Sequence, residues 1–254
     1  MSLLRTDGLA KEFGGVRAVD DLTLAIERGA VHSIIGPNGA GKTTLLNLLT
    51  GIYSPSAGRI YFGDRDLTGR APHEFAAQGI ARTFQNLQVF FNMSAVENVM
   101  VGRHLREHRG IGAALLRLPR VVAGERAGRE EAAELLGFVG LETWADAAAD
   151  ALPYGALKRL EIARALATRP QLLLLDEPAA GLNPTETQEV HALIAKLARG
   201  GITVVLVEHN MRLVMGVSDR ILVLDYGRRL AEGSAAAVRN DPRVIEAYLG
   251  AGAD

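Results

Sequence analysis

The sequence contains no cysteine and no long apolar run. The absence of cysteine excludes disulfide bonds, cysteine–zinc sites and thiol catalysis, and it is compatible with the cytosol. No stretch approaches the roughly 18 consecutive apolar residues of a membrane-spanning helix. The start, Met1 to Asp7, lacks the apolar stretch of a signal peptide. If the protein acts at a membrane, we therefore expect it to act through a partner.

The chain also lacks an excess of charge of one sign. Its formal net charge is -1, with 22% charged and 48% hydrophobic residues. A chain this balanced has no broad basic field to attract nucleic acid, so no nucleic-acid partner is expected. The composition is that of a globular protein, and 254 residues suffice for one α/β domain with a smaller subdomain.

Apolar spacing predicts strands that alternate with helices. Short strands are predicted at residues 22–26, 31–35, 59–62, 172–175, 203–207 and 221–224. The four consecutive leucines at 172–175 indicate a strand buried on both faces. A helix is predicted from Lys42, with Gly51 as its stop. This order of strand, glycine-rich loop and helix predicts an α/β fold.

A second helix has clear signals at both ends. Asn183 can cap it, Pro184 lies in its first turn, and Glu186 follows three residues after the cap. The pair Gly200-Gly201 ends it.

The stretch 101–141 is rich in alanine, arginine, glutamate and glycine, and it predicts a helical insertion. Within it, residues 111–122 mix leucines with arginines, which leaves two interpretations. A basic amphipathic helix could lie on a membrane surface, or the segment could be a solvated helix of the insertion. Pro119 favours the second interpretation, because proline interrupts a continuous helix.

One segment has the pattern G-x-x-x-x-G-K-[ST], namely Gly36-Pro37-Asn38-Gly39-Ala40-Gly41-Lys42-Thr43. Its glycines let backbone N–H groups turn toward phosphate oxygens, and the helix that follows directs its positive end at the same charge. Lys42 is expected to reach the β- and γ-phosphates, the Thr43 hydroxyl to bind Mg²⁺, and Thr44 to add a nucleotide contact. The strand before the loop and the helix after it argue against a chance glycine-rich turn. The sequence therefore predicts nucleotide binding.

Two carboxylates, Asp176 and Glu177, follow the leucine strand 172–175. Ligands of open α/β sheets bind at the carboxyl ends of the strands. We expect Asp176 to hold Mg²⁺ through water, and Glu177 to orient and polarise the attacking water. The alternative is a solvated turn, and the phosphate loop upstream argues against it.

Three further candidates have weaker signals. His209 ends a strand that could lie beside the acidic one, so its ring could reach the γ-phosphate; a lone histidine is otherwise usually structural. Gln85, taken alone, is an ordinary loop amide. Phe13 lies ahead of the phosphate loop, where it either stacks on adenine or belongs to the core.

Together these motifs resemble the ABC transporter ATPase family along nearly the whole chain. The deciding segment is LPYGALKRLEIARAL at 152–166, which stands where the family carries its signature sequence. The resemblance implies an α/β P-loop ATPase core with an antiparallel β subdomain and a helical subdomain. It implies one domain over residues 4–250, with the helical part at roughly 87–165. It also implies that two cassettes pair head to tail, so that each ATP lies between one phosphate loop and the partner's signature.

The other family motifs match single residues of this sequence. Phe13 matches the adenine-stacking position, Gln85 the glutamine loop that contacts Mg²⁺ and faces the membrane subunit, and His209 the switch histidine. The segment 180–183 matches the dimer-contact loop. The resemblance therefore implies ATP and Mg²⁺ as cofactors. It implies a metal site at Thr43, Gln85 and Asp176, and catalytic roles for Glu177, His209, Lys42 and Gln85.

The signature residues, which the resemblance implies act in trans, are Pro153, Tyr154, Gly155 and Ala156. The family usually has Leu-Ser-Gly-Gly-Gln here, so Pro153 replaces a serine and Ala156 a glutamine. Proline offers neither a hydroxyl nor an N–H group, and one hydrogen bond to the γ-phosphate is therefore missing. The dimer-contact loop also ends in Asn183 where aspartate is common.

Longer segments narrow the resemblance. The chain is similar to the LivG-type ATPase subunit of branched-chain amino acid importers in five segments: LPYG…LEIARAL, DEPAAGLNP, VEHNM, MGVSDRILVLDYGRRLAEG and DPRVIEAYLG. The similarity implies transmembrane permease subunits and a second ATP-binding subunit as partners. The two cassettes could form a hetero- or homodimer, and the LivG-type resemblance implies a different, shorter cassette. It implies a periplasmic binding protein as an indirect partner, and a peripheral location at the cytoplasmic face of the inner membrane.

Other functions remain open at this point. The cassette could serve an importer of other amides or urea-like compounds, or an exporter. An ABC-type ATPase of translation or DNA repair is disfavoured by the single phosphate loop and the absence of cysteines and heptads. A regulator that binds nucleotide without hydrolysing it is disfavoured by Glu177 and His209.

Overall fold

The computed structural model describes residues 2–104 and 119–250, which form two compact units. The first unit comprises the chain up to Arg82 and from Gln171 onward, and the second comprises residues 83–170. The second unit encloses the range 87–165 expected for the helical part. Most of the segment 111–122, considered above as an amphipathic helix, lies outside the described residues.

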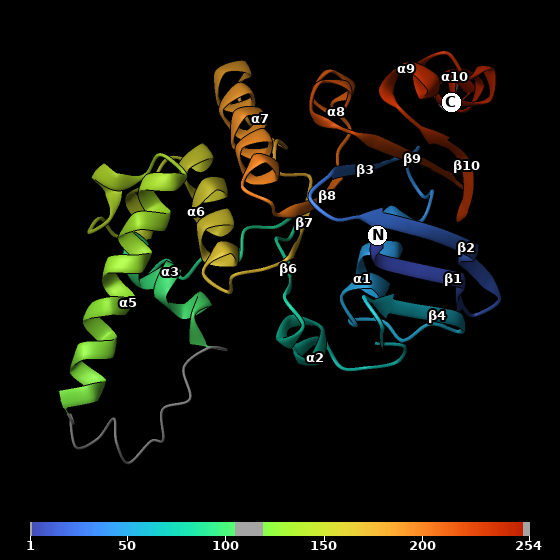
Figure 1. Ribbon diagram of the computed structural model, residues 1–254. Coiled ribbons are helices and arrows are strands. Elements are labelled where there is room, and N and C mark those ends of the chain that lie inside the picture. The colour runs from blue at the N-terminus through green and yellow to red at the C-terminus, as the bar shows by residue number, and fades with distance from the viewer. Residues whose placement is uncertain (1, 105–118, 251–254) are drawn as a thin grey trace. The chain divides into compact units, whose positions relative to one another are not determined.

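A six-stranded sheet forms the centre of the first unit (Figure 1). Its order is β10-β9-β3-β8-β7-β6, and all neighbouring strands are parallel except β10, which is antiparallel to β9. The strands are β3 (Val31–Ile35), β6 (Ile80–Arg82), β7 (Leu172–Asp176), β8 (Thr203–Val207), β9 (Arg220–Asp225) and β10 (Arg228–Gly233). The strands predicted from the sequence at 31–35, 172–175, 203–207 and 221–224 are thereby confirmed.

An antiparallel sheet of order β2-β1-β4-β5 accompanies it. Its strands are β1 (Ser2–Phe13), β2 (Val16–Glu27), β4 (Ala57–Phe62) and β5 (Arg65–Asp66). The predicted strands 22–26 and 59–62 lie within β2 and β4. Strand β1 was not predicted from the sequence, and its pairing with β2 shifts register several times. Such shifts interrupt the period-two alternation that reveals a strand in a sequence.

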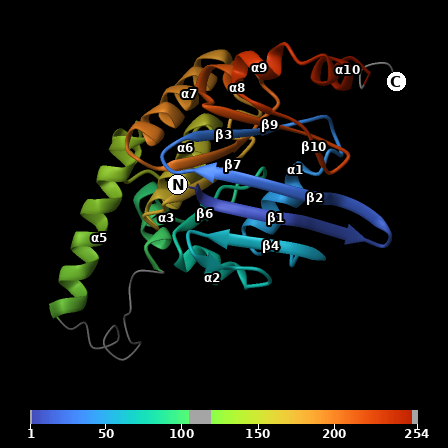
Figure 2. The same cartoon turned by 45° about the vertical axis from the view of Figure 1, so that its right-hand side comes forward.

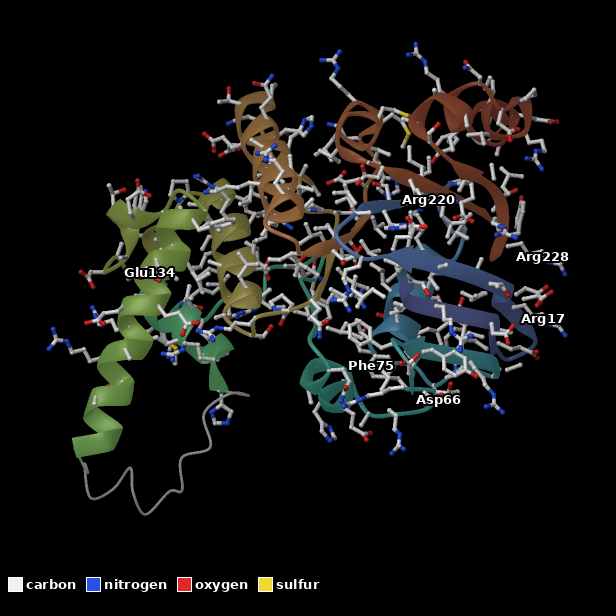
Figure 3. The ribbon with its side chains drawn as sticks, viewed as in Figure 1. Arg17, Asp66, Phe75, Glu134, Arg220 and Arg228 are labelled. Atoms are coloured by element: carbon white, nitrogen blue, oxygen red, sulfur yellow. The ribbon has the colours of Figure 1, made fainter. Side chains whose placement is uncertain are left out.

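The helices of the first unit are α1 (Lys42–Leu49), α2 (Pro72–Ala77), α7 (Pro184–Arg199), α8 (Met211–Val217), α9 (Ala235–Arg239) and α10 (Pro242–Gly250). Helix α7 has the predicted capping box: the Asn183 side chain accepts from the Glu186 N–H at 3.0 Å, and the Glu186 carboxylate accepts from the Asn183 N–H at 3.0 Å. Helix α1 ends before Gly51, as predicted. A Cβ atom there would lie 2.6 Å from the ring of buried Phe75, which Figure 3 labels.

The parallel sheet has a different apolar layer on each face. On β9, Leu222 and Leu224 belong to a core shared with α1 and the antiparallel sheet. The intervening Ile221 and Val223 belong to a second core with residues of α8, α9 and α10. Figure 2 shows these helices on one side of the sheet and β1, β2 and β4 on the other. The sheet is therefore buried on both faces, which leaves the strand ends as the place for polar chemistry.

The second unit is helical, as predicted for the insertion. It contains α3 (Ala95–Gly102), α5 (Pro119–Phe138), the short 3-10 turns η2 (Glu142–Trp144) and η3 (Ala149–Ala151), and α6 (Tyr154–Leu166). A Cβ atom on Gly102 would lie 2.1 Å from the Arg164 carbonyl oxygen, so glycine permits α3 to approach α6 closely. None of the helices described in either unit is long and apolar enough to cross a membrane.

Candidate functional site

The phosphate-loop segment connects β3 to α1, as its sequence predicts. Two constraints favour glycine at positions 36 and 41: the φ angles are positive, at 153° and 96°, and a side chain would collide with neighbouring backbone. A Cβ atom on Gly36 would lie 2.1 Å from the Leu224 carbonyl oxygen, and one on Gly41 would lie 2.2 Å from that of Ala18. The turn after β9 also holds the loop, because the Gly227 N–H donates to the Ala40 carbonyl at 3.0 Å. The loop is thus fixed from outside before any ligand binds.

The side chain of Lys42 folds back into this loop. Its ammonium group donates to the carbonyl oxygens of Gly36 at 2.8 Å and Pro37 at 2.9 Å. Burial lowers the pKa of Lys42, while the charges of Glu177 and Asp176 act in the opposite direction. The lysine that the sequence assigns to phosphate binding therefore lies in the electrostatic field of both predicted carboxylates.

Asp176 ends β7 and is buried, with 4% of its surface exposed. Its Oδ2 atom accepts a hydrogen bond from Nη2 of Arg82 at 2.7 Å, in an ion pair whose side chains are both 5% exposed. Arg82 ends the neighbouring strand β6. Arg82 was not among the site residues predicted from the sequence. A strand of three residues gives no periodic signal, so nothing marked Arg82 as the neighbour of the acidic strand.

Glu177 and His209 form a second pair. The imidazole Nε2 of His209 lies 2.8 Å from Oε1 of Glu177. The two residues follow β7 and β8, which are parallel neighbours, so their strand ends meet at the same edge of the sheet. Glu177 has a positive φ of 50°, and its N–H donates to the Val207 carbonyl at 2.9 Å. A left-handed backbone is uncommon for a residue other than glycine, so contacts such as this hydrogen bond must hold the turn after β7 in place.

A further carboxylate, Glu208, supports this pair and was not singled out from the sequence. It is 4% exposed. Its carboxylate accepts from the backbone N–H groups of Ala179 at 2.8 Å and His209 at 3.1 Å. Glu208 thus ties the turn after Glu177 to the start of the histidine segment.

Phe13, at the end of β1, is 42% exposed. Its ring meets that of Tyr53 edge-on, with the centroids 5.3 Å apart, and the Lys11 ammonium lies 5.0 Å from its centroid. The interpretation of Phe13 as a core residue is therefore wrong. Stacking on adenine stays a prediction, and an exposed ring is compatible with it.

The signature residues and Gln85 lie in the second unit. Pro153 is the N-cap of α6 and contributes no side-chain hydrogen bond to the cap, and Tyr154, the first helical residue, is 45% exposed. From the next turns of α6, Lys158 donates to the Gln85 carbonyl at 3.0 Å. The predicted contacts of Gln85 and of the signature with nucleotide remain predictions, because the phosphate loop belongs to the other unit.

The donor set of the first unit fits Mg²⁺ only in combination with phosphate. No group of three or more His, Cys, Asp or Glu side chains placed to hold a metal ion occurs among the described residues. Asp176 supplies one carboxylate, and Thr43, which is exposed at the start of α1, supplies a hydroxyl. Mg²⁺ typically takes one or two protein carboxylates together with the phosphates of a nucleotide. The hard oxygen donors present match that pattern.

A glycine loop at a helix N-terminus, a lysine within it and carboxylates at the adjacent strand ends define a P-loop nucleotide-binding protein. Comparison with known proteins narrows this class. The family model described as ABC transporter matches residues 19–180. A second model, described as branched-chain amino acid ATP-binding cassette transporter, matches residues 228–254. The chain belongs to the ABC transporter family.

Individual relatives agree with this assignment. The chain is 47% identical to the high-affinity branched-chain amino acid transport ATP-binding protein BraF of Pseudomonas aeruginosa, over 98% of both chains. It is 45% identical to the corresponding protein LivG of Escherichia coli K12, again over 98% of both. A solved ATP-binding cassette of an ABC transporter in its ADP conformation has a TM-score of 0.85 at 33% identity, with 98% of this chain and 99% of that chain covered. The predicted family and fold class are confirmed.

Proposed function

We propose that this chain is the ATP-binding and ATP-hydrolysing subunit that energises an ABC importer of branched-chain amino acids. The observation that supports the proposal is the contact of His209 Nε2 with Glu177 Oε1 at 2.8 Å. These residues follow β8 and β7, which come next after the phosphate-loop strand β3 in the order of the sheet. A nucleotide-binding regulator would need no such pair. The choice of branched-chain amino acids rests on the similarity to LivG and BraF and on the match at residues 228–254.

The residues of the first unit divide the chemistry among them. Lys42 and the N–H groups of the phosphate loop bind the β- and γ-phosphates. Glu177 accepts a proton from the attacking water, and His209 holds the carboxylate in place and can donate to the γ-phosphate. Thr43 and Asp176 would hold Mg²⁺, with Gln85 as a further ligand. When bound, the ion offsets the negative charge that the phosphates carry.

The partners follow from the same proposal. ATP hydrolysis drives transport through the permease subunits, and a second cassette supplies the signature opposite this phosphate loop. A periplasmic binding protein delivers the solute. The chain would then lie at the cytoplasmic face of the inner membrane as a peripheral subunit. Pro153, the N-cap of α6, makes no side-chain hydrogen bond to the cap. The first N–H groups of a helix have no partner within the helix and suit a phosphate, which supports the arrangement of two cassettes.

Nucleotide titration tests the binding site. Lys42→Ala is expected to abolish tight ATP binding, because the loop loses its only side-chain cation. Lys196→Ala, in the last turn of α7, is the matched control and should bind ATP normally. Equal affinities of Lys42→Ala and the unsubstituted chain would rule out this loop as the site.

Reconstitution tests the substrate. The chain is assembled in vesicles with candidate permease subunits, a second cassette and a binding protein. Leucine, isoleucine or valine is expected to stimulate ATP hydrolysis. Stimulation by an unrelated amide, without a response to these amino acids, would reassign the importer and keep the ATPase.

A further inference from the structure

Arg82 connects the predicted metal ligand to the helix that follows the phosphate loop. One arm of its guanidinium, Nη2, donates to Oδ2 of Asp176 at 2.7 Å. The other arm, Nη1, donates to Oδ1 of Asn47 at 2.6 Å and lies 3.4 Å from Oγ1 of Thr50. Asn47 belongs to α1, one turn and a half beyond Lys42. A single planar group thus fixes two parts of the site, and all of these residues belong to the first unit.

The burial of the ion pair makes this contact consequential. Both side chains are 5% exposed, so solvent does little to screen their charges. A buried carboxylate without a counter-charge is strongly unfavourable. Lys42 also acts on Asp176 electrostatically, but its ammonium group is engaged by the loop carbonyls of Gly36 and Pro37. Within residues 2–104 and 119–250, Arg82 is therefore the cation in direct contact with Asp176.

We propose that Arg82 is a positioning residue of the ATPase site: it holds Oδ2 of Asp176, leaves the other carboxylate oxygen for Mg²⁺, and weakens the metal's hold by occupying part of the carboxylate's charge. The proposal rests on the proposed ATPase function.

The proposal predicts how Mg²⁺ and Arg82 substitute for one another. With Arg82 present, the charge of Asp176 is already compensated in the structure without Mg²⁺. With a neutral residue in its place, Mg²⁺ becomes the principal compensating charge, so the metal should contribute more to nucleotide binding. The guanidinium and Mg²⁺ carry charge of the same sign, so they act on the same carboxylate charge, and the effect of removing one on the binding of the other is electrostatic.

The measured quantity is the Mg²⁺ gain, defined as the ratio of the dissociation constant of a fluorescent ATP analogue in EDTA to that in Mg²⁺. It is measured on the full chain with Glu177→Gln, so that hydrolysis does not contribute. Arg82→Gln is expected to raise the gain about tenfold, the order of size of a Coulomb interaction between close charges. Arg82→Lys keeps the charge and should leave the gain near that of the unsubstituted residue. Arg103→Gln removes a comparable arginine–carboxylate pair in the second unit, with Glu131 at 3.0 Å, and should not change it.

Each outcome decides the matter. If Arg82→Gln folds and has the same gain as the chain with arginine, the proposal is overturned. If Arg82→Gln is unfolded in EDTA, addition of Mg·ATP should restore the circular dichroism of the folded chain, and addition of ATP in EDTA should not. If both additions restore it, or if neither does, the proposal is also overturned. If the chain with arginine binds the analogue under no condition, the proposed ATPase function fails instead, which keeps the two failures distinct.

Discussion

Two adjacent carboxylates at the end of β7 have different surroundings. Asp176 is buried against Arg82, whereas Glu177 is turned by its left-handed backbone toward His209. Such a difference in environment lets two like residues take different roles in one site. Under the proposed function, Asp176, which is buried beside a cation, is the metal ligand, and Glu177, which contacts an imidazole, is the base for the attacking water.

Glu177→Gln is expected to keep ATP binding and to remove most hydrolysis, because an amide cannot accept the proton of water. The amide retains the size of the side chain and can still hydrogen-bond His209. Nucleotide affinity and turnover are measured in the assembled transporter. Glu134→Gln, on the exposed side of α5 (Figure 3), controls for the loss of a charge. Full turnover of Glu177→Gln would exclude this glutamate as the base.

A pH effect is expected from His32, which is 7% exposed on β3. Its Nε2 accepts the Glu27 N–H at 2.9 Å, so the ring is neutral at this nitrogen. Burial lowers the pKa of His32, and the charge of Arg220 acts in the same direction. Because the folded-state pKa lies below the ordinary value, the unfolded chain binds more protons, and stability is lost as the pH falls below about 6.5.

Urea unfolding at pH 7.5 and 5.5 measures this effect, which is at most about 1.4 kcal/mol per pH unit. In His32→Gln the amide oxygen can accept the same N–H but does not titrate. The variant should therefore lose less free energy of unfolding between the two pH values than the unsubstituted chain. An equal loss in both would show that His32 is not responsible.

At the scale of elements, α6 holds the glutamine loop at two points. Lys158 donates to the Gln85 carbonyl at 3.0 Å, and Oε1 of Glu161 accepts from the Gln88 N–H at 2.6 Å. Both side chains are 3% exposed. The helix that begins at the signature is therefore fastened to the loop predicted to face the membrane subunit, and a displacement of one should move the other.

Lys158→Met is expected to remove the hydrogen bond from α6 to the Gln85 carbonyl while conserving most of the side-chain volume. Loss of a hydrogen bond from a charged donor costs about 1.5–3 kcal/mol of stability. Basal ATP hydrolysis should change little, and its stimulation by permease subunits and loaded binding protein should fall. Arg126→Met, on an exposed pair of α5, should leave both unchanged. If stimulation of ATP hydrolysis is undiminished in Lys158→Met, this contact does not couple the permease subunits to hydrolysis.

At the scale of the whole molecule, the proposed pairing with a different cassette makes the two ATP sites unequal. In that pairing, Lys42, Glu177 and His209 would serve the nucleotide bound to this chain, and Pro153 to Ala156 would serve the nucleotide bound to the partner. Pro153→Ser restores a hydroxyl, and a hydrogen bond to a charged group is worth about 1.5–3 kcal/mol. The affinity for ATP at the partner's site should increase about tenfold. Loss of the rigidity that the proline gives to the loop would oppose this increase.

Site-resolved binding in the assembled transporter, with each phosphate-loop lysine disabled in turn, measures this asymmetry. The Pro153→Ser effect should persist when Lys42 is disabled and vanish when the partner's lysine is. The opposite pattern would show that the signature acts on this chain's own nucleotide.

The features that the sequence by itself determined are local ones. The phosphate loop, the buried strands β3, β7 and β8, and the capped start of α7 each depend on residues close together in the chain. Glycine conformation, apolar runs and capping boxes act over a few residues, so a sequence displays them directly. The family resemblance extended these local motifs to the correct fold class.

Only the tertiary structure decided which distant residues meet. Strand β1 has an irregular register, and β6 is too short for a pattern, so neither was visible in the sequence. The ion pair of Arg82 with Asp176 joins residues 94 positions apart and exists because β6 lies beside β7. The exposure of Phe13 and the Glu177–His209 contact depend likewise on how strands are ordered. Strand order is set by the packing of both sheet faces over the whole unit, which no short stretch of sequence contains.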